Sequence, residues 1–275
     1  MRSVSTQNAT IDYEVRGAGP SLGLINGLGF GRWGFFKQVP ALSRRFATIT
    51  FDAREGRDPE GVIEGLASDV ADLLAHLGVN RAHVLGTSLG GFVAQELALS
   101  RPELVARLVL VSTGHGGRGS ERMSLGTMGT MFGLGALSAK AAARRGLEGA
   151  TSERYRAENP DEFERIVQKR LSDSPSVASY YGQALAGSRF DDSAEVGRIG
   201  SPTLVIHGSE DSYVPPSNAR ALAEAIPNAR LRILEGAGHL VFVERAAEVN
   251  REVMTFLSDG EARVAPGSVA SDRRG

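Results

Sequence analysis

A serine with glycine two residues before and two residues after it lies in the segment 86–90 (Gly-Thr-Ser-Leu-Gly), a spacing typical of an exposed nucleophile. The pattern needs a tight turn between a strand and a helix, and a bulky residue at either glycine would clash with nearby backbone. An apolar run over 81–85 predicts the strand, and residues 92–99 predict the helix. Ser88 is therefore the candidate nucleophile. The turn also places the Leu89 amide at a helix N-terminus, where a developing oxyanion is stabilised.

A serine nucleophile needs a base and a group that orients the base, and two later segments contain candidates. The strand expected over 203–206 leads into a loop with the acidic residues Glu210 and Asp211. The strand expected over 231–234 leads into a loop with His239 among small residues. The order along the chain is therefore serine, acid, histidine.

The composition narrows the class of protein and the kind of partner. The chain has 275 residues, 41% of them hydrophobic, which is enough to form one large core. Its formal net charge of -1 does not indicate binding to nucleic acid or to an anionic membrane. With no cysteine, the chain has no disulfides, thiol nucleophile or thiolate metal site. No apolar segment has the length of a signal peptide or a membrane span. We expect a cytoplasmic protein that binds a small molecule, and the oligomeric state is left open.

Strand-like apolar runs alternate with helical patterns along most of the chain, which is typical of a doubly wound, mostly parallel α/β sheet. The expected strands are 11–15, 22–25, 47–51, 82–85, 108–111, 203–206 and 231–234. The expected helices are 62–77, 92–100, 217–225 and 246–257.

The alternation stops after residue 112 and resumes near residue 202, which predicts an insertion above the carboxyl edge of the sheet. We therefore expect a main domain formed by residues 1–114 and 201–258 and a helical cap formed by residues 115–200. Residues 259–275 are polar and lack periodicity, and they are expected to be a disordered tail.

Within the predicted cap, residues 123–139 contain no charged side chain but several methionines. This segment either packs against the main domain or forms an adaptable apolar roof over the substrate. Candidate residues for the substrate pocket are Gly27, Trp33, His115, Met128, Phe132 and Leu240. His207, which precedes the acid loop, is expected to be a packing residue.

Three separated motifs in this order resemble the α/β-hydrolase superfamily over roughly residues 9–257. The segment 86–91 resembles its nucleophile elbow and 208–211 its acid loop. Gly238 and His239, with Phe242, Glu244 and Asn250 after them, resemble its histidine segment. The resemblance implies an α/β-hydrolase fold and favours Asp211 over Glu210 as the acid.

The segment 24–29 resembles the oxyanion loop of the superfamily, with Asn26 in place of the usual histidine. By that resemblance, the backbone amides of Leu28 and Leu89 form the oxyanion hole. The chain departs from the superfamily over 52–58, where a charged residue replaces the first glycine and the usual serine is absent. We therefore expect a rebuilt loop there.

The implied mechanism is acyl transfer through Ser88, with no metal and no organic cofactor. A serine nucleophile excludes the branches that attack with an aspartate. The sequence of the main domain most resembles those of small serine esterases, enol-lactonases and cofactor-free haloperoxidases. The first expectation is therefore hydrolysis of an ester or lactone of a small, largely apolar substrate. C–C bond hydrolysis and biosynthetic cyclisation or other acyl transfer use the same triad. A ligand-binding module with little turnover is the alternative from a different class.

Overall fold

The computed structural model describes residues 2–6, 10–52, 61–132, 135, 138–173 and 175–259. Within these residues, eight strands form one sheet in the order β1-β2-β4-β3-β5-β6-β7-β8. The first two pairings, β1 with β2 and β2 with β4, are antiparallel, and the other neighbours are parallel. The strands are β1 (Arg2–Ser5), β2 (Thr10–Arg16), β3 (Ser21–Ile25), β4 (Ala47–Phe51), β5 (Ala82–Thr87), β6 (Val105–Val111), β7 (Thr203–Gly208) and β8 (Arg230–Leu234).

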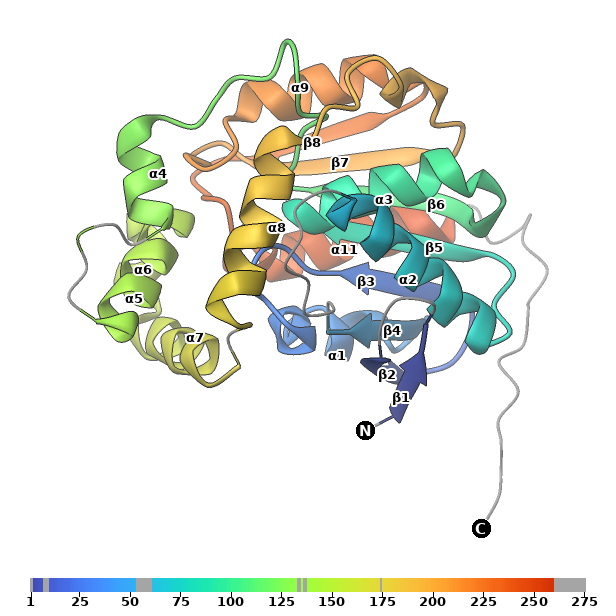
Figure 1. Cartoon of the computed structure of the whole chain (residues 1–275), viewed down its shortest axis with the longest axis horizontal. Helices are drawn as coiled ribbons and strands as arrows, with labels where there is room; N and C mark the ends of the chain where they lie inside the picture. Colours follow the sequence, from blue (N-terminus) through green and yellow to red (C-terminus); the bar gives the residue numbers. More distant parts are fainter. Residues whose placement is uncertain are drawn as a thin grey trace.

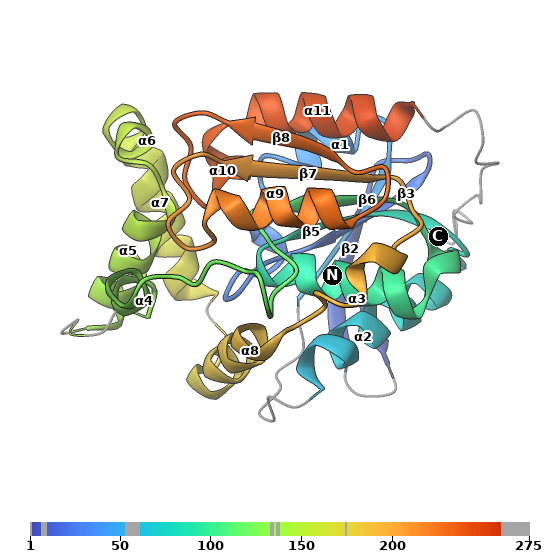
Figure 2. The same cartoon turned by 90° about the horizontal axis from the view of Figure 1, so that it is seen from above.

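Helices cover both faces of the sheet, as Figure 2 shows. One face carries α2 (Val62–His76), α3 (Leu89–Ser100) and α9 (Pro216–Ala225), and the other carries α1 (Val39–Leu42) and α11 (Ala246–Ser258). Shorter helical turns are η1 (Arg32–Phe35), η2 (Pro102–Leu104), η3 (Val196–Arg198) and α10 (Val241–Glu244). This doubly wound arrangement confirms the predicted fold class.

Burial explains why the apolar runs form central strands. Every residue of β3, β4, β5 and β7 is buried, as expected of parallel strands covered on both faces. The helix predicted over 62–77 is α2, which buries its periodic apolar positions in the core. β1 was not predicted, because Val4 is its one buried residue and a strand with three exposed residues has no apolar pattern.

Five α-helices lie between β6 and β7 in the part of the chain that the structure describes, and we call them the cap helices. They are α4 (Leu125–Met131), α5 (Ala139–Ala150), α6 (Glu153–Glu158), α7 (Pro160–Ser172) and α8 (Val177–Arg189). Figure 1 shows α4 to α7 on the left, beyond one end of the sheet, and α8 between them and the strands. Serine side chains cap four of them by accepting a hydrogen bond from a backbone amide in the first turn: Ser124, Ser138, Ser152 and Ser176.

Two sequence expectations fall on residues outside the described ranges. The loop expected to be rebuilt over 52–58 falls outside the described residues from residue 53 on, and the tail expected over 259–275 does so from residue 260 on. Among the described residues, no helix combines the length and the apolar composition needed to cross a membrane.

Candidate active site

Ser88 occupies a strained turn between the end of β5 and the start of α3. Its backbone has φ 52° and ψ -119°, a conformation that residues other than glycine rarely adopt. A Cβ atom added at Gly86 would lie 2.2 Å from the Gly90 carbonyl oxygen, and one added at Gly90 would lie 2.2 Å from the Ile25 carbonyl oxygen. The predicted clash at both glycines is confirmed, and the turn presents Ser88 at the carboxyl edge of the sheet.

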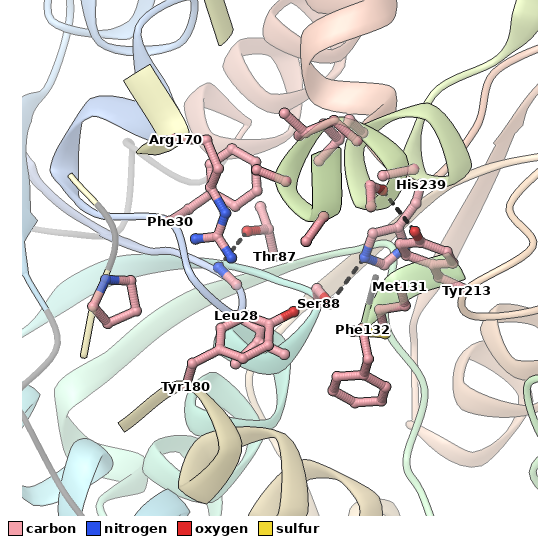
Figure 3. A pocket seen from close by; sticks show the side chains of 18 of the residues that line it. Leu28, Phe30, Thr87, Ser88, Met131, Phe132, Arg170, Tyr180, Tyr213 and His239 are labelled. Atoms are coloured by element: carbon pink, nitrogen blue, oxygen red, sulfur yellow. Dashed lines mark hydrogen bonds between the residues drawn. The ribbon is translucent and has the colours of Figure 1, made fainter. Parts of the chain in front are cut away.

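The structure brings Ser88, His239 and Asp211 together from the ends of three strands. His239 Nε2 lies 2.9 Å from Ser88 Oγ, and His239 Nδ1 lies 2.8 Å from Asp211 Oδ2. Figure 3 shows the His239 ring directed at Ser88. The backbone amides of Tyr213 and Val214 donate to the other carboxylate oxygen of Asp211, each at 2.9 Å. The acid is therefore oriented by its own loop and by the histidine.

Asp211 is 3% exposed, and its surroundings favour the charged form. Burial alone would raise its pKa, but attraction to His239 and hydrogen bonds from His207 and His239 hold the pKa of Asp211 well below its ordinary value. His207 Nε2 lies 3.1 Å from Asp211 Oδ2 and 2.8 Å from the Val214 carbonyl oxygen. His207 is buried, as a packing residue would be, but it also positions the acid, a role that the sequence alone did not indicate.

Two hydroxyl groups that follow β6 hold the backbone of the serine and the histidine. Thr113 Oγ1 donates to the Ser88 carbonyl oxygen at 3.0 Å, and Ser112 Oγ donates to the His239 carbonyl oxygen at 2.7 Å. The residues after β6 supply no carboxylate, but their hydroxyl groups hold the loop of Ser88 and the loop of His239 close together.

The two backbone amides predicted for an oxyanion hole belong to the residue after Ser88 and to a loop that lines the same cavity. Leu89 is the first residue of α3, so its amide has no acceptor within the helix. Leu28 lines the same cavity as Ser88 and follows Gly27, where an added Cβ would lie 3.0 Å from Ser88 Cβ. The Gly27 amide donates to Thr87 Oγ1 at 3.1 Å, which ties the loop of Leu28 to the elbow.

A cavity of about 360 Å³ opens above Ser88, between the strand ends and the cap helices. Its described wall is mostly apolar, with small residues and Leu147 from α5 and several aromatic side chains from other elements. The lining residues are Gly27, Leu28, Phe30, Thr87, Ser88, Ser112, Met131, Phe132, Ala139, Ala142, Ala143, Gly146, Leu147, Ala150, Arg170, Leu171, Pro175, Val177, Tyr180, Tyr181, Tyr213, His239, Leu240 and Phe242.

Three of the six predicted pocket residues, Gly27, Phe132 and Leu240, line this cavity, and three do not. Trp33 packs on the ring of Phe30, with centroids 4.9 Å apart, and so lies behind the wall.

The other two lie elsewhere for different reasons. His115 is buried but is not part of the cavity wall, and its Nδ1 lies 2.8 Å from the Gly116 carbonyl oxygen. Met128 is 40% exposed, and α4 presents Met131 to the cavity instead.

Sequence reasoning missed Arg170, Tyr180 and Tyr213, which line the cavity. Arg170 and Tyr180 come from α7 and α8, whose mixed polar and apolar sequences carry no motif. No signal in the sequence indicates which side of a cap helix faces the serine, because that depends on how the helices pack.

Comparison with known proteins decides the family. A family model described as alpha/beta hydrolase fold matches residues 20–246, which include the serine, the acid and the histidine. The chain belongs to this family. The predicted superfamily membership is confirmed, and the protein is a hydrolase.

Individual relatives span nearly the whole chain. RutD of Agrobacterium fabrum, provisionally named a carbamate hydrolase, is 29% identical over 89% of this chain and 97% of its own. BpoC of Mycobacterium tuberculosis, provisionally named a non-heme bromoperoxidase, is 31% identical over 91% of this chain and 98% of its own. The crystal structure of the enol-lactonase from Burkholderia xenovorans LB400 has a TM-score of 0.82, with 25% identity over 94% of this chain and 100% of that chain.

Proposed function

We propose that the protein is a serine hydrolase that cleaves an ester or lactone of a small, largely apolar substrate through an acyl-enzyme on Ser88. The observation that carries the proposal is the chain of contacts from Ser88 Oγ through His239 to the buried Asp211, at 2.9 Å and 2.8 Å, in the wall of a cavity. The likeness to an enol-lactonase and to a provisionally named carbamate hydrolase supports acyl chemistry.

In the proposed first half-reaction, Ser88 Oγ attacks the substrate carbonyl carbon while His239 Nε2 takes the Ser88 proton. Asp211 accepts a hydrogen bond from the Nδ1–H group of His239 and stabilises the imidazolium that forms. The Leu28 and Leu89 amides donate to the oxyanion. When the intermediate collapses, His239 returns the proton to the leaving oxygen, and the acyl group stays on Ser88.

The second half-reaction repeats these steps with water as the nucleophile. His239 takes a proton from the water as it attacks the acyl carbon, and Ser88 Oγ leaves with that proton. The product is a carboxylic acid. A cavity of about 360 Å³ is near the lower end of the usual range for small-molecule sites, which favours a small substrate.

The first test uses a fluorophosphonate, which labels an activated serine before any substrate is known. Mass spectrometry of the intact wild-type protein should show one adduct, and Ser88→Ala should show none. Ser100→Ala, which removes an exposed hydroxyl at the end of α3, is the matched control and should keep the adduct. An unlabelled wild type, or an adduct that survives Ser88→Ala, would contradict the proposal.

A further inference from the structure

Arg170 brings a positive charge into a wall that is otherwise apolar or neutral. It projects from α7 and lines the same cavity as Ser88. Among the described residues of this wall there is no aspartate or glutamate, and the other basic side chain is His239. Figure 3 shows Arg170 and His239 on opposite sides of Ser88. The cavity therefore has one end beside the base and another beside a guanidinium.

The guanidinium of Arg170 is held between aromatic rings and the loop that carries Leu28. Its Cζ lies 5.5 Å from the ring centroid of Phe30 and 5.3 Å from that of Tyr180. An added Cβ at Gly29 would lie 1.8 Å from Arg170 Nη2, so the group rests directly on the backbone next to Leu28. The structure thus places the cation beside the proposed oxyanion hole.

Burial sets the electrostatic state of this group. It lowers the pKa of Arg170 below its ordinary value, while attraction to the Tyr180 phenol and a hydrogen bond with it act in the opposite direction. An arginine remains protonated at neutral pH even after such a shift. A cation removed from water in this way gains most from a bound anion, because the surrounding wall screens charge weakly.

We propose that Arg170 is a specificity-determining residue that binds a carboxylate of the substrate, so that the preferred substrates are esters or lactones with a carboxylate in the acyl part. The planar fork of a guanidinium matches the two oxygens of a carboxylate. The apolar wall would contact the methylene groups between that carboxylate and the reacting carbonyl. The proposal rests on the proposed function, because Ser88 defines where the carbonyl lies.

The positions of the two basic side chains indicate that the substrate carboxylate belongs to the acyl part and not to the leaving group. In the proposed mechanism, His239 must deliver a proton to the leaving oxygen, so the leaving group lies on the His239 side of Ser88. Arg170 lies on the opposite side, beside Gly29 and Leu28. A carboxylate at Arg170 is therefore joined to the carbonyl carbon through the acyl chain.

A purely structural role for Arg170 makes a different prediction. If the guanidinium only braced the loop at Gly29, its loss would impair the hydrolysis of charged and neutral substrates alike. If it binds a carboxylate, its loss changes the ratio between them. The informative quantity is therefore the preference for a carboxylate over a neutral group of the same shape.

The experiment compares the monoethyl esters of succinate, glutarate and adipate with their primary amides, in which a carboxamide replaces the free carboxylate. For at least one chain length, the wild type should have a higher kcat/KM for the carboxylate form. Arg170→Gln should lower this preference by about 10- to 100-fold, the range expected for a charge-assisted hydrogen-bonded pair. Arg165→Gln removes an exposed arginine from the same helix and should keep the preference.

A binding measurement separates this proposal from the proposed function. Calorimetry on Ser88→Ala measures binding of the same intact esters without turnover. Ser88→Ala should bind the carboxylate form more tightly than the amide, and the Ser88→Ala, Arg170→Gln double variant should lose this preference. Arg170→Lys, which keeps the charge but not the planar guanidinium, should keep part of the preference. Equal affinity for acid and amide, or a preference that survives Arg170→Gln, would overturn the carboxylate site. Failure of the fluorophosphonate to label Ser88 would instead overturn the hydrolase mechanism.

Discussion

The loops at the strand ends and the cap helices form opposite walls of one cavity, but their side chains are positioned in different ways. Ser88, Asp211 and His239 are held by short loops, by backbone hydrogen bonds and by glycines that no larger residue can replace. Arg170 and the small residues of α5 reach the cavity through the packing of whole helices. The reactive groups are therefore positioned by the local geometry of turns, whereas the choice of substrate depends on which faces of the cap helices line the cavity.

The largest effect that this comparison predicts is at the histidine of the strand-end loops. His239→Gln should lower kcat by about a thousandfold or more, because the serine, base and acid act as a unit. His115→Gln is the control, since His115 is also a buried histidine but lies outside the described cavity wall. Steady-state kinetics on an ester that the wild type hydrolyses would measure both. A similar loss of kcat in both variants would contradict the assignment of His239, and not His115, to the active site.

The two walls are joined by Glu244, which predicts an intermediate effect. Glu244 Oε1 accepts from the Gly238 amide at 3.1 Å and from the Ser152 amide at 3.0 Å, and Oε2 accepts from Ser152 Oγ at 2.6 Å. The pKa of this carboxyl is raised by burial, against these hydrogen bonds. It connects the residue before His239 to the N-terminus of α6.

Glu244→Ala should leave buried amides without acceptors and lower the free energy of unfolding by about 2 kcal/mol. It should also lower kcat by about tenfold, since His239 follows the loosened Gly238. Glu248→Ala, which removes a more exposed carboxylate paired with Arg245, is the control and should change stability by under about 1 kcal/mol. Urea unfolding and kinetics measure these effects. A tenfold loss in kcat without any loss of stability would show that Glu244 acts on the chemistry itself.

The smallest predicted effect is at Asp192, where the chain returns from α8 to the sheet. Burial, with repulsion from Glu96 and Glu64 and from neighbouring acids, raises the pKa of Asp192 to about 7. The folded protein therefore holds this proton more tightly than the unfolded chain does. Protonated Asp192 therefore contributes to the free energy of unfolding at acidic pH, and this contribution should be lost as the pH rises from about 4 through 7.

Asp192→Asn should remove this loss and stabilise the protein more at pH 8 than at pH 5.5. Because the side chain is only partly buried, solvent screening limits the gain to about 1 kcal/mol at pH 8. Thermal unfolding at the two pH values provides the measurement, with Glu224→Gln as a control that removes an exposed negative charge from α9. An equal effect at both pH values would contradict the raised pKa.

The helices and strands of the sheet were predicted well because their signals are local. The predicted strands match observed strands, with β5 starting one residue after the run at 81–85, and α2, α9 and α11 differ from their predictions by one residue at an end. The positions of Ser88, Asp211 and His239 at the strand ends also followed from motif spacing. The pocket residues were predicted less well, as Trp33, His115 and Met128 show.

The sequence by itself determined which residues carry the proposed chemistry, because a strained turn, an acid loop and a histidine loop each depend on a few neighbouring residues. The tertiary structure decided what surrounds them: the contact of His207 with Asp211, the link through Glu244 and the entry of Arg170 into the cavity. These contacts join residues from separate elements. Their geometry depends on how helices rotate and pack against one another, and that orientation is a property of the whole fold.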